Sequence, residues 1–148
     1  MKYIFYILPV LAGAALAVQS GLNAQLRVAL SNPILAAFIS FFTGTIALAL
    51  LLAVSKQALP ALSVYSTISW YKFVGGLLGV FIVTNAIVSV QEIGASNMYV
   101  LIIAGQLITA VIMDHFGILG LKQNPVTFQK IAGILLLVVG AYLVNKSK

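Results

Sequence analysis

The chain has 148 residues, of which 62% are hydrophobic and 7% are charged, and its mean hydropathy is +1.14. Soluble proteins carry about a quarter charged residues, and a core of this size cannot hide so much apolar surface from water, so a soluble domain is excluded. The net charge of +6 comes from bases that stand between apolar runs, without interleaved aromatics, which argues against nucleic acid as a partner. The chain has no cysteine, which excludes disulfides and thiolate metal sites.

Five apolar runs are long enough to cross a hydrocarbon core of about 30 Å as helices rising 1.5 Å per residue. They predict an all-α integral membrane protein with one membrane domain over residues 1–148. The predicted spans cover residues 3–26, 33–54, 72–91, 95–116 and 126–144.

The first run has an alternative interpretation as a secretory signal peptide. Lys2 would be its basic end, and residues 15–17 would form a small-residue cleavage site. The helical pattern continues beyond that site, however, because Gln19, Asn23 and Arg27 follow one another at intervals of four residues. This spacing places the three side chains along one helix face.

The next segments contain residues typical of a helix start, a connecting loop and a helix-packing face. Asn32 and Pro33 predict the N-cap and first residue of the second helix. Residues 57–69 predict a loop along the membrane interface, followed by aromatic residues that anchor the third helix. That helix carries small residues spaced for close helix packing, namely Gly75, Gly76 and Gly79.

An odd number of spans places the two termini on opposite sides of the membrane. Five bases then lie on the N-terminal side and three on the other, so the positive-inside rule favours an inside N-terminus. Because this difference is small, we expect a minority of the population to insert in the other orientation. The five are Lys2, Lys56, Lys72, Lys122 and Lys130, and the three are Arg27, Lys146 and Lys148.

Several uncharged polar residues fall at similar membrane depths. Gln106 lies near the middle of its span, and Gln19 and Asn85 lie about 5–7 Å from the middle of theirs. Asn23 is one turn shallower. These four residues predict a substrate-binding cluster near the midplane. The alternative is that the amides join helices to one another, at about 0.6 kcal/mol each.

Asp114 and His115 lie at the end of the fourth span, within reach of water. We interpret them as a gate or coupling element, or alternatively as a solvated turn in which His115, Lys122 or Lys130 pairs with Asp114. A membrane enzyme using this pair would need a third catalytic group, which the chain does not offer. We therefore expect no enzyme activity, no cofactor and no metal.

The joint pattern of these segments resembles the YdcZ-like family of small bacterial membrane proteins, within the drug/metabolite transporter superfamily. It is carried by GAALAVQSGLNAQL, FISFFTGT, GGLLGV, GQL, DHFGILG and GILLLVVGAYLVN. The family motif positions present here are Gln19, Asn23, Gly75, Gly76, Gly105, Gln106, Asp114, His115 and Gly117.

The resemblance implies a location in the bacterial cytoplasmic (inner) membrane and an antiparallel dimer of five-helix subunits. The partner would be an identical chain or a close paralogue. The last helix is similar to the dimer-forming helix of small multidrug resistance proteins, in which two glycines, here Gly133 and Gly140, share a packing face. Those exporters carry a membrane-embedded glutamate in the first helix. This chain has Gln19 and no acid there, so proton-for-cation antiport is not carried over.

The sequence thus predicts a transporter that works by alternating access in an antiparallel dimer. Inverted repeats of this kind place the site at the midplane between repeats. Its expected partners are a second copy or paralogue, membrane lipid and a small polar metabolite. The alternative is a membrane scaffold without transport activity, or a subunit of a larger complex.

Overall fold

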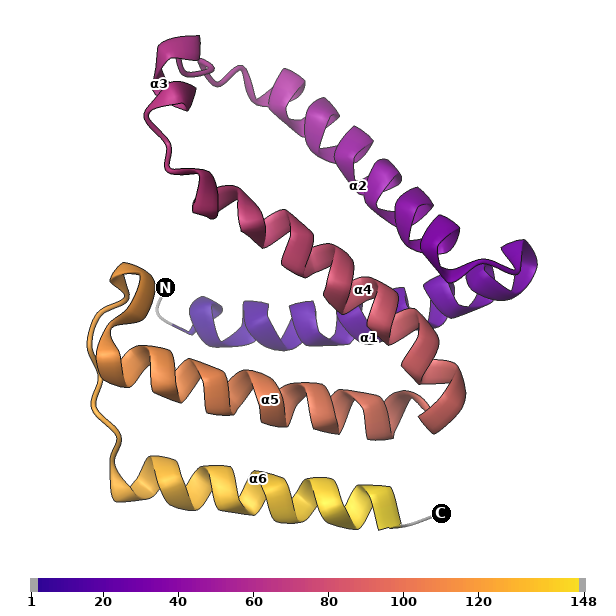
Figure 1. Ribbon diagram of the computed structural model, residues 1–148, viewed down its shortest axis with the longest axis vertical. Coiled ribbons are helices and arrows are strands. Elements are labelled where there is room, and N and C mark those ends of the chain that lie inside the picture. Colours follow the sequence, from indigo (N-terminus) through magenta and orange to yellow (C-terminus); the bar gives the residue numbers. More distant parts are fainter. Residues whose placement is uncertain (1–2, 147–148) are drawn as a thin grey trace. The chain divides into compact units, whose positions relative to one another are not determined.

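The computed structural model describes residues 3–146, and every regular element in that range is a helix (Figure 1). Five of these helices are long and apolar enough to cross a membrane. This confirms the predicted class of all-α membrane protein. The long helices are α1 (Ile4–Leu30), α2 (Pro33–Ser55), α4 (Val74–Ile93), α5 (Ala95–Phe116) and α6 (Phe128–Lys146). The short ones are α3 (Leu62–Ser66), η1 (Trp70–Phe73) and η2 (Ile118–Gly120).

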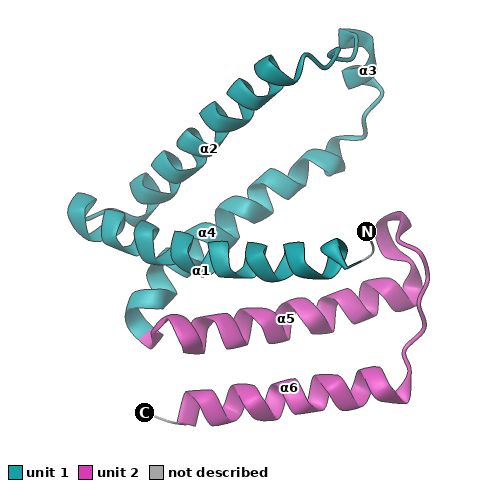
Figure 2. Cartoon of the chain, turned by 180° about the vertical axis from the view of Figure 1, so that it is seen from behind, with its two compact units in different colours: residues 1–92 teal, residues 93–148 magenta. Residues whose placement is uncertain are grey.

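The chain forms two compact units, residues 1–92 and residues 93–148 (Figure 2). Unit 1 contains α1, α2, α3 and α4, and unit 2 contains α5 and α6. That they act together as one membrane domain stays a prediction.

The core of unit 1 is small and lies where three helices meet. Ala36 and Ala37 of α2 pack against Ile87 of α4, and Leu26 and Val83 cover this cluster. Small side chains let helix backbones approach closely, which is the usual basis of helix packing in lipid. The helices of unit 1 are therefore joined where α1 turns into α2.

Two side chains form hydrogen bonds between α1 and α4 at the same end. We call this pair, Arg27 and Gln91, the α1–α4 clamp. Arg27 donates through Nη1 to the carbonyl oxygens of Ile87 and Val88, at 3.4 Å each. Gln91 donates in the opposite direction, through Nε2 to the carbonyl oxygen of Ala24 at 3.0 Å. Helix α1 continues beyond the predicted end at residue 26 as far as Leu30, which brings Arg27 into this contact.

The turn between α1 and α2 follows the sequence signals. Ser31 adopts a left-handed conformation after α1, with φ of 51°. The Asn32 side chain accepts hydrogen bonds from the backbone N–H groups of Ile34 and Leu35 at 2.9 and 3.0 Å. Pro33 occupies the first helical position, where its missing N–H costs no helical hydrogen bond. The predicted N-cap is confirmed.

Unit 2 is an antiparallel pair, α5 and α6, joined by a turn (Figures 1 and 2). Its buried residues are Asn97 and Met98 of α5 and Ala141 of α6. The Asn97 side chain donates a hydrogen bond through Nδ2 to the carbonyl oxygen of Ile93, four residues earlier in the chain, at 2.8 Å. Asn145 does the same at 2.9 Å from the carbonyl oxygen of Ala141. The amides of the buried Asn97 and the half-buried Asn145 are therefore hydrogen-bonded to nearby backbone carbonyls.

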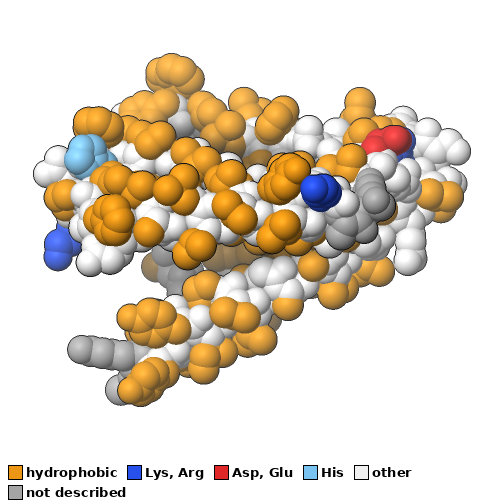
Figure 3. Space-filling model, turned by 90° about the horizontal axis from the view of Figure 1, so that it is seen from below, with side chains coloured by type: hydrophobic (Ala, Val, Ile, Leu, Met, Phe, Trp, Pro, Cys, Tyr) orange, Lys and Arg blue, Asp and Glu red, His pale blue; other side chains and the backbone are white. Residues whose placement is uncertain are grey.

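Outside the two cores, the large hydrophobic side chains are exposed. Leu51 is 65% exposed and Leu136 is 73% exposed, and the face shown in Figure 3 is covered by hydrophobic side chains with few charged ones. A soluble monomer rarely exposes such a continuous apolar surface. This surface suits lipid or another membrane helix.

The α1–α4 clamp predicts a stability effect. Arg27→Met keeps much of the aliphatic stem but removes the donors, so the free energy of unfolding should fall by about 1–2 kcal/mol. Thermal unfolding of the purified protein in detergent measures this change. Arg27→Lys, which retains a cationic donor, should lose less, and an unchanged melting temperature for Arg27→Met would show that the clamp contributes nothing.

Candidate functional site

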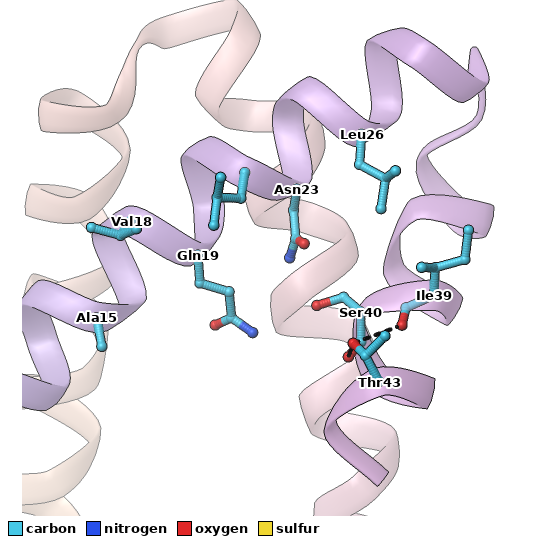
Figure 4. A pocket seen from close by; sticks show the side chains of 9 residues that line it. Ala15, Val18, Gln19, Asn23, Leu26, Ile39, Ser40 and Thr43 are labelled. Atoms are coloured by element: carbon cyan, nitrogen blue, oxygen red, sulfur yellow. Dashed lines mark hydrogen bonds between the residues drawn. The ribbon is translucent and has the colours of Figure 1, made fainter. Parts of the chain in front are cut away.

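An open groove of about 660 Å³ lies between α1 and α2 in unit 1 (Figure 4). We call it the α1–α2 groove. Most of its lining is apolar, but polar side chains enter it from both helices. The lining residues are Ala15, Val18, Gln19, Leu22, Asn23, Leu26, Ile39, Ser40 and Thr43.

Helical spacing explains why the polar side chains meet there. Gln19 and Asn23 are four residues apart on α1, and Ser40 and Thr43 are three apart on α2, so each pair shares a helix face. Figure 4 shows the two amides pointing from α1 toward the space beside Ser40 and Thr43. Asn23 is only 6% exposed, whereas Gln19 is exposed. The groove thus carries two amides on one wall and two hydroxyls on the other.

These polar groups differ in what they can still bind. Thr43 donates its hydroxyl proton to its own helix, with Oγ1 3.1 Å from the carbonyl oxygen of Ile39 and 2.9 Å from that of Ser40. Its oxygen therefore faces the groove as an acceptor. Among residues 3–146, the side chains of Gln19, Asn23 and Ser40 form no hydrogen bond with another residue. Both amides can therefore donate and accept.

Asn85 lines a different groove, of about 500 Å³, between α2 and α4. Thr84 lines the same groove beside Asn85. The Oδ1 atom of Asn85 accepts a hydrogen bond from the Ser89 hydroxyl at 3.1 Å. Unit 1 therefore brings Gln19 and Asn23 together and places Asn85 in a second groove. Gln106 is an exposed residue of α5 in unit 2. A midplane cluster of all four residues stays a prediction.

The glycines expected to pack helices have different surroundings. A Cβ atom built on Gly79 would lie 3.5 Å from the ring of Phe41, so this aromatic side chain of α2 packs against α4 at Gly79. At the other four glycines, no described atom beyond the glycine's own stretch of helix backbone lies within 4 Å of the corresponding position. Their faces are open in the single chain, and their packing role stays a prediction. These four are Gly75, Gly76, Gly133 and Gly140.

Asp114 and His115 anchor the turn that follows α5. Gly117 ends the helix in a left-handed conformation, with φ of 63°, which glycine adopts without steric cost. The carbonyl oxygen of Asp114 accepts a hydrogen bond from the Asn124 N–H at 2.8 Å. His115 Nδ1 accepts one from the Val126 N–H at 3.2 Å. The His115 side chain therefore acts here as a hydrogen-bond acceptor for the turn.

Lys130 does not pair with Asp114, although it was one of the expected partners. Its ammonium group donates to the carbonyl oxygens of Asn124 and Pro125 at 2.9 and 3.0 Å. No ion pair involving Asp114 is present within residues 3–146. The turn is held by backbone hydrogen bonds and by His115 and Lys130, and a gating or coupling role for Asp114 and His115 stays a prediction.

Sequence reasoning missed the two hydroxyls of the α1–α2 groove. The signal was present in the segment FISFFTGT, where Ser40 and Thr43 are spaced for one helix face. Threonines and serines in apolar helices usually bond their own backbone, so this spacing alone does not indicate a binding site. Only the approach of α1 to α2 distinguishes Ser40 and Thr43 from other hydroxyls such as Thr45, which donates to the carbonyl oxygen of Phe41.

Five apolar helices with small interhelical cores and a polar groove define a multi-pass helical membrane protein. The family model described as "Putative inner membrane exporter, YdcZ" matches residues 4–143. The inner membrane protein YdcZ of Escherichia coli (strain K12) is 30% identical over 135 residues, which cover 91% of this chain and 90% of that protein. The chain therefore belongs to the YdcZ family and is a multi-pass protein of the bacterial inner membrane. No solved structure matches it.

The hydrogen bond from Val126 to His115 predicts the behaviour of the turn. His115→Leu removes the acceptor, so the Val126 amide should exchange with deuterium about fivefold faster, as expected for a loss of about 1 kcal/mol. Hydrogen exchange read by mass spectrometry over peptides that contain Val126 measures this. His115→Asn keeps an acceptor oxygen near the Nδ1 position and should exchange more slowly than His115→Leu. Equal rates in all three proteins would contradict the anchoring role.

Proposed function

We propose that the protein exports a small polar metabolite across the inner membrane, and that the α1–α2 groove is its binding site. The main observation in support of this binding site is that two helices direct amides and hydroxyls into one otherwise apolar groove. The description of the family as an inner membrane exporter supports the direction of transport. It also favours a carrier over an enzyme.

The environment of Gln19 supports a functional interpretation of the groove. An amide that faces hydrocarbon without a partner costs several kcal/mol. Gln19 is exposed in the single chain, and its amide is not bonded to its own helix as those of Asn97 and Asn145 are. A second protein surface, bound water or a solute would supply the missing partners.

We assign the covering surface to a second copy or a close paralogue, inserted in the opposite orientation. Five spans and a small charge bias permit both orientations. Two such chains would form an inverted pair of ten helices, with the groove between them near the midplane. Alternating access would then expose the groove first to one side of the membrane and then to the other. Asn85 and Gln106 would complete the site in the assembled protein.

Asp114 and His115 would serve as a gate or coupling element at the membrane edge. Their supporting observation is the hydrogen bond from Val126 to His115, because a movement of the turn has to break it. The pair would therefore act through the position of the turn between α5 and α6.

The groove predicts which substitutions abolish export. In cells that express the protein, Gln19→Leu and Asn23→Leu should abolish the accumulation of at least one polar metabolite outside the cell, because they remove its hydrogen-bond partners. Mass spectrometry of the medium measures this accumulation.

Gln25→Leu is the matched control, since Gln25 lies on α1, is exposed and does not line the groove. It should export as the unmodified protein does. Monodisperse elution of each variant in detergent shows that folding is intact. If expression changes no metabolite outside the cell and native cross-linking yields a complex with an unrelated protein, the scaffold hypothesis replaces the carrier.

The antiparallel dimer predicts dual insertion. Ser63→Cys places a single thiol in α3, since the chain has no other cysteine. A membrane-impermeant thiol reagent should label about half of this variant in spheroplasts and the remainder after permeabilisation, because the two orientations occur in equal numbers in such a dimer. Complete labelling or complete protection before permeabilisation would contradict an antiparallel dimer of identical chains and would leave a paralogue in the opposite orientation as the partner.

A further inference from the structure

We propose that the substrate of the α1–α2 groove is uncharged and carries both hydrogen-bond donors and acceptors beside an apolar face. This inference rests on the proposed function, because it takes the groove to be the substrate site. Its basis is the lining, in which every polar group is a neutral amide or hydroxyl. A buried charge needs a charged or hydrogen-bonded partner, and the groove supplies no side chain of opposite charge.

A cationic substrate lacks a counter-ion. The chain has two acids, Glu92 and Asp114. Glu92 is the residue before the end of α4, and Asp114 lies two residues before the end of α5. Neither lines the groove. A second copy of the chain would add only the same acids at the same helix ends, so a homomeric assembly does not change this conclusion.

An anionic substrate also lacks a partner. Arg27 is the base nearest to the groove along α1, one helical turn beyond Asn23. Its Nη1 atom donates to carbonyl oxygens of α4, and the residue is not part of the lining. The site therefore offers a carboxylate or phosphate only neutral donors, and loss of the hydration of such a group would cost several kcal/mol.

The hydrogen-bonding state of the lining defines the substrate further. Thr43 presents an acceptor, because its proton is donated to backbone carbonyls, so it calls for a hydroxyl or amide N–H on the substrate. The amides of Gln19 and Asn23 each offer two N–H donors and one oxygen acceptor. Val18, Leu22 and Ile39 line the rest and suit a hydrocarbon face. Small hydroxylated or amide-bearing neutral metabolites have this combination.

The absence of native cysteine allows the charge preference to be measured without knowing the substrate. Ser40→Cys places a thiol in the groove at a side chain that makes no hydrogen bond with residues 3–146. Three methanethiosulfonates of similar size serve as probes, with hydroxyethyl, trimethylammonium-ethyl and sulfonatoethyl groups. Labelling rates are measured in proteoliposomes and divided by those of Ser63→Cys, whose side chain is exposed in α3.

The uncharged reagent should label Ser40→Cys at least tenfold faster than either charged reagent after this correction, since an unpaired charge in the groove costs more than about 1.4 kcal/mol. Equal or faster labelling by a charged reagent overturns the inference. If Gln19-dependent export persists in that case, the proposed function stands and only the substrate class is wrong. If none of the reagents reaches Ser40→Cys while Ser63→Cys is labelled, the groove is closed to solutes, and both proposals fail.

A charge placed in the groove provides a second measurement. Gln19→Glu combined with Ser40→Cys supplies a carboxylate, so the corrected rate of the cationic reagent should rise at least tenfold over that of Ser40→Cys alone. Gln25→Glu with Ser40→Cys is the matched control and should leave it unchanged. A similar rise in both variants would show that the effect is general electrostatic attraction, which would overturn the assignment of Gln19 to the lining.

Discussion

The hydrocarbon core of the membrane offers no hydrogen-bond partners, and every polar group in the chain has to be satisfied by protein or by a solute. In a helix, the backbone N–H and carbonyl groups form hydrogen bonds with one another and so need no partner from the lipid. Several side chains donate to backbone carbonyls four residues earlier, including those of Thr45, Asn97 and Asn145. Gln19 and Asn23 differ, because they face a groove instead of a carbonyl of their own helix. Their arrangement has no explanation in the stability of a single helix, which is why the functional interpretation centres on them.

The same solvent changes what holds the helices together. Lipid removes the hydrophobic driving force between helices, so packing and polar ties decide which helices associate. In unit 1, two alanines of α2 allow close contact with Ile87, and the α1–α4 clamp fixes the same end by side chain to backbone hydrogen bonds. The polar groups that hold unit 1 together are thus separate from those that line the groove. A substitution in one set can be made without removing the other.

The sequence predicted the five spans and the cap at Asn32, because span length, apolar composition and capping chemistry are local properties. It also placed Gln19 and Asn23 on one face, since their separation of four residues defines a helical angle. The sequence could not show which other helix would pack against the face that carries Gln19 and Asn23. Depth suggested that Asn85 would join them, which stays a prediction. Depth is one coordinate, and within unit 1 Asn85 lines a second groove, between α2 and α4. Lys130, one of three candidate partners of Asp114, instead donates to the carbonyl oxygens of Asn124 and Pro125, because these turn carbonyls lie within reach of its ammonium group.

The separation of charge from the groove has a consequence for energetics. Moving one elementary charge across a membrane potential of 100 mV involves about 2.3 kcal/mol, and an uncharged substrate is not subject to this force. A neutral solute therefore leaves the cell down its own concentration gradient unless an ion or proton moves with it. In this chain Asp114 and His115, the residues proposed to couple such an ion, lie near the end of α5, beside the α5–α6 turn. Coupling would then have to act through movement of the turn, because no ionisable group in the groove can exchange a proton with the substrate.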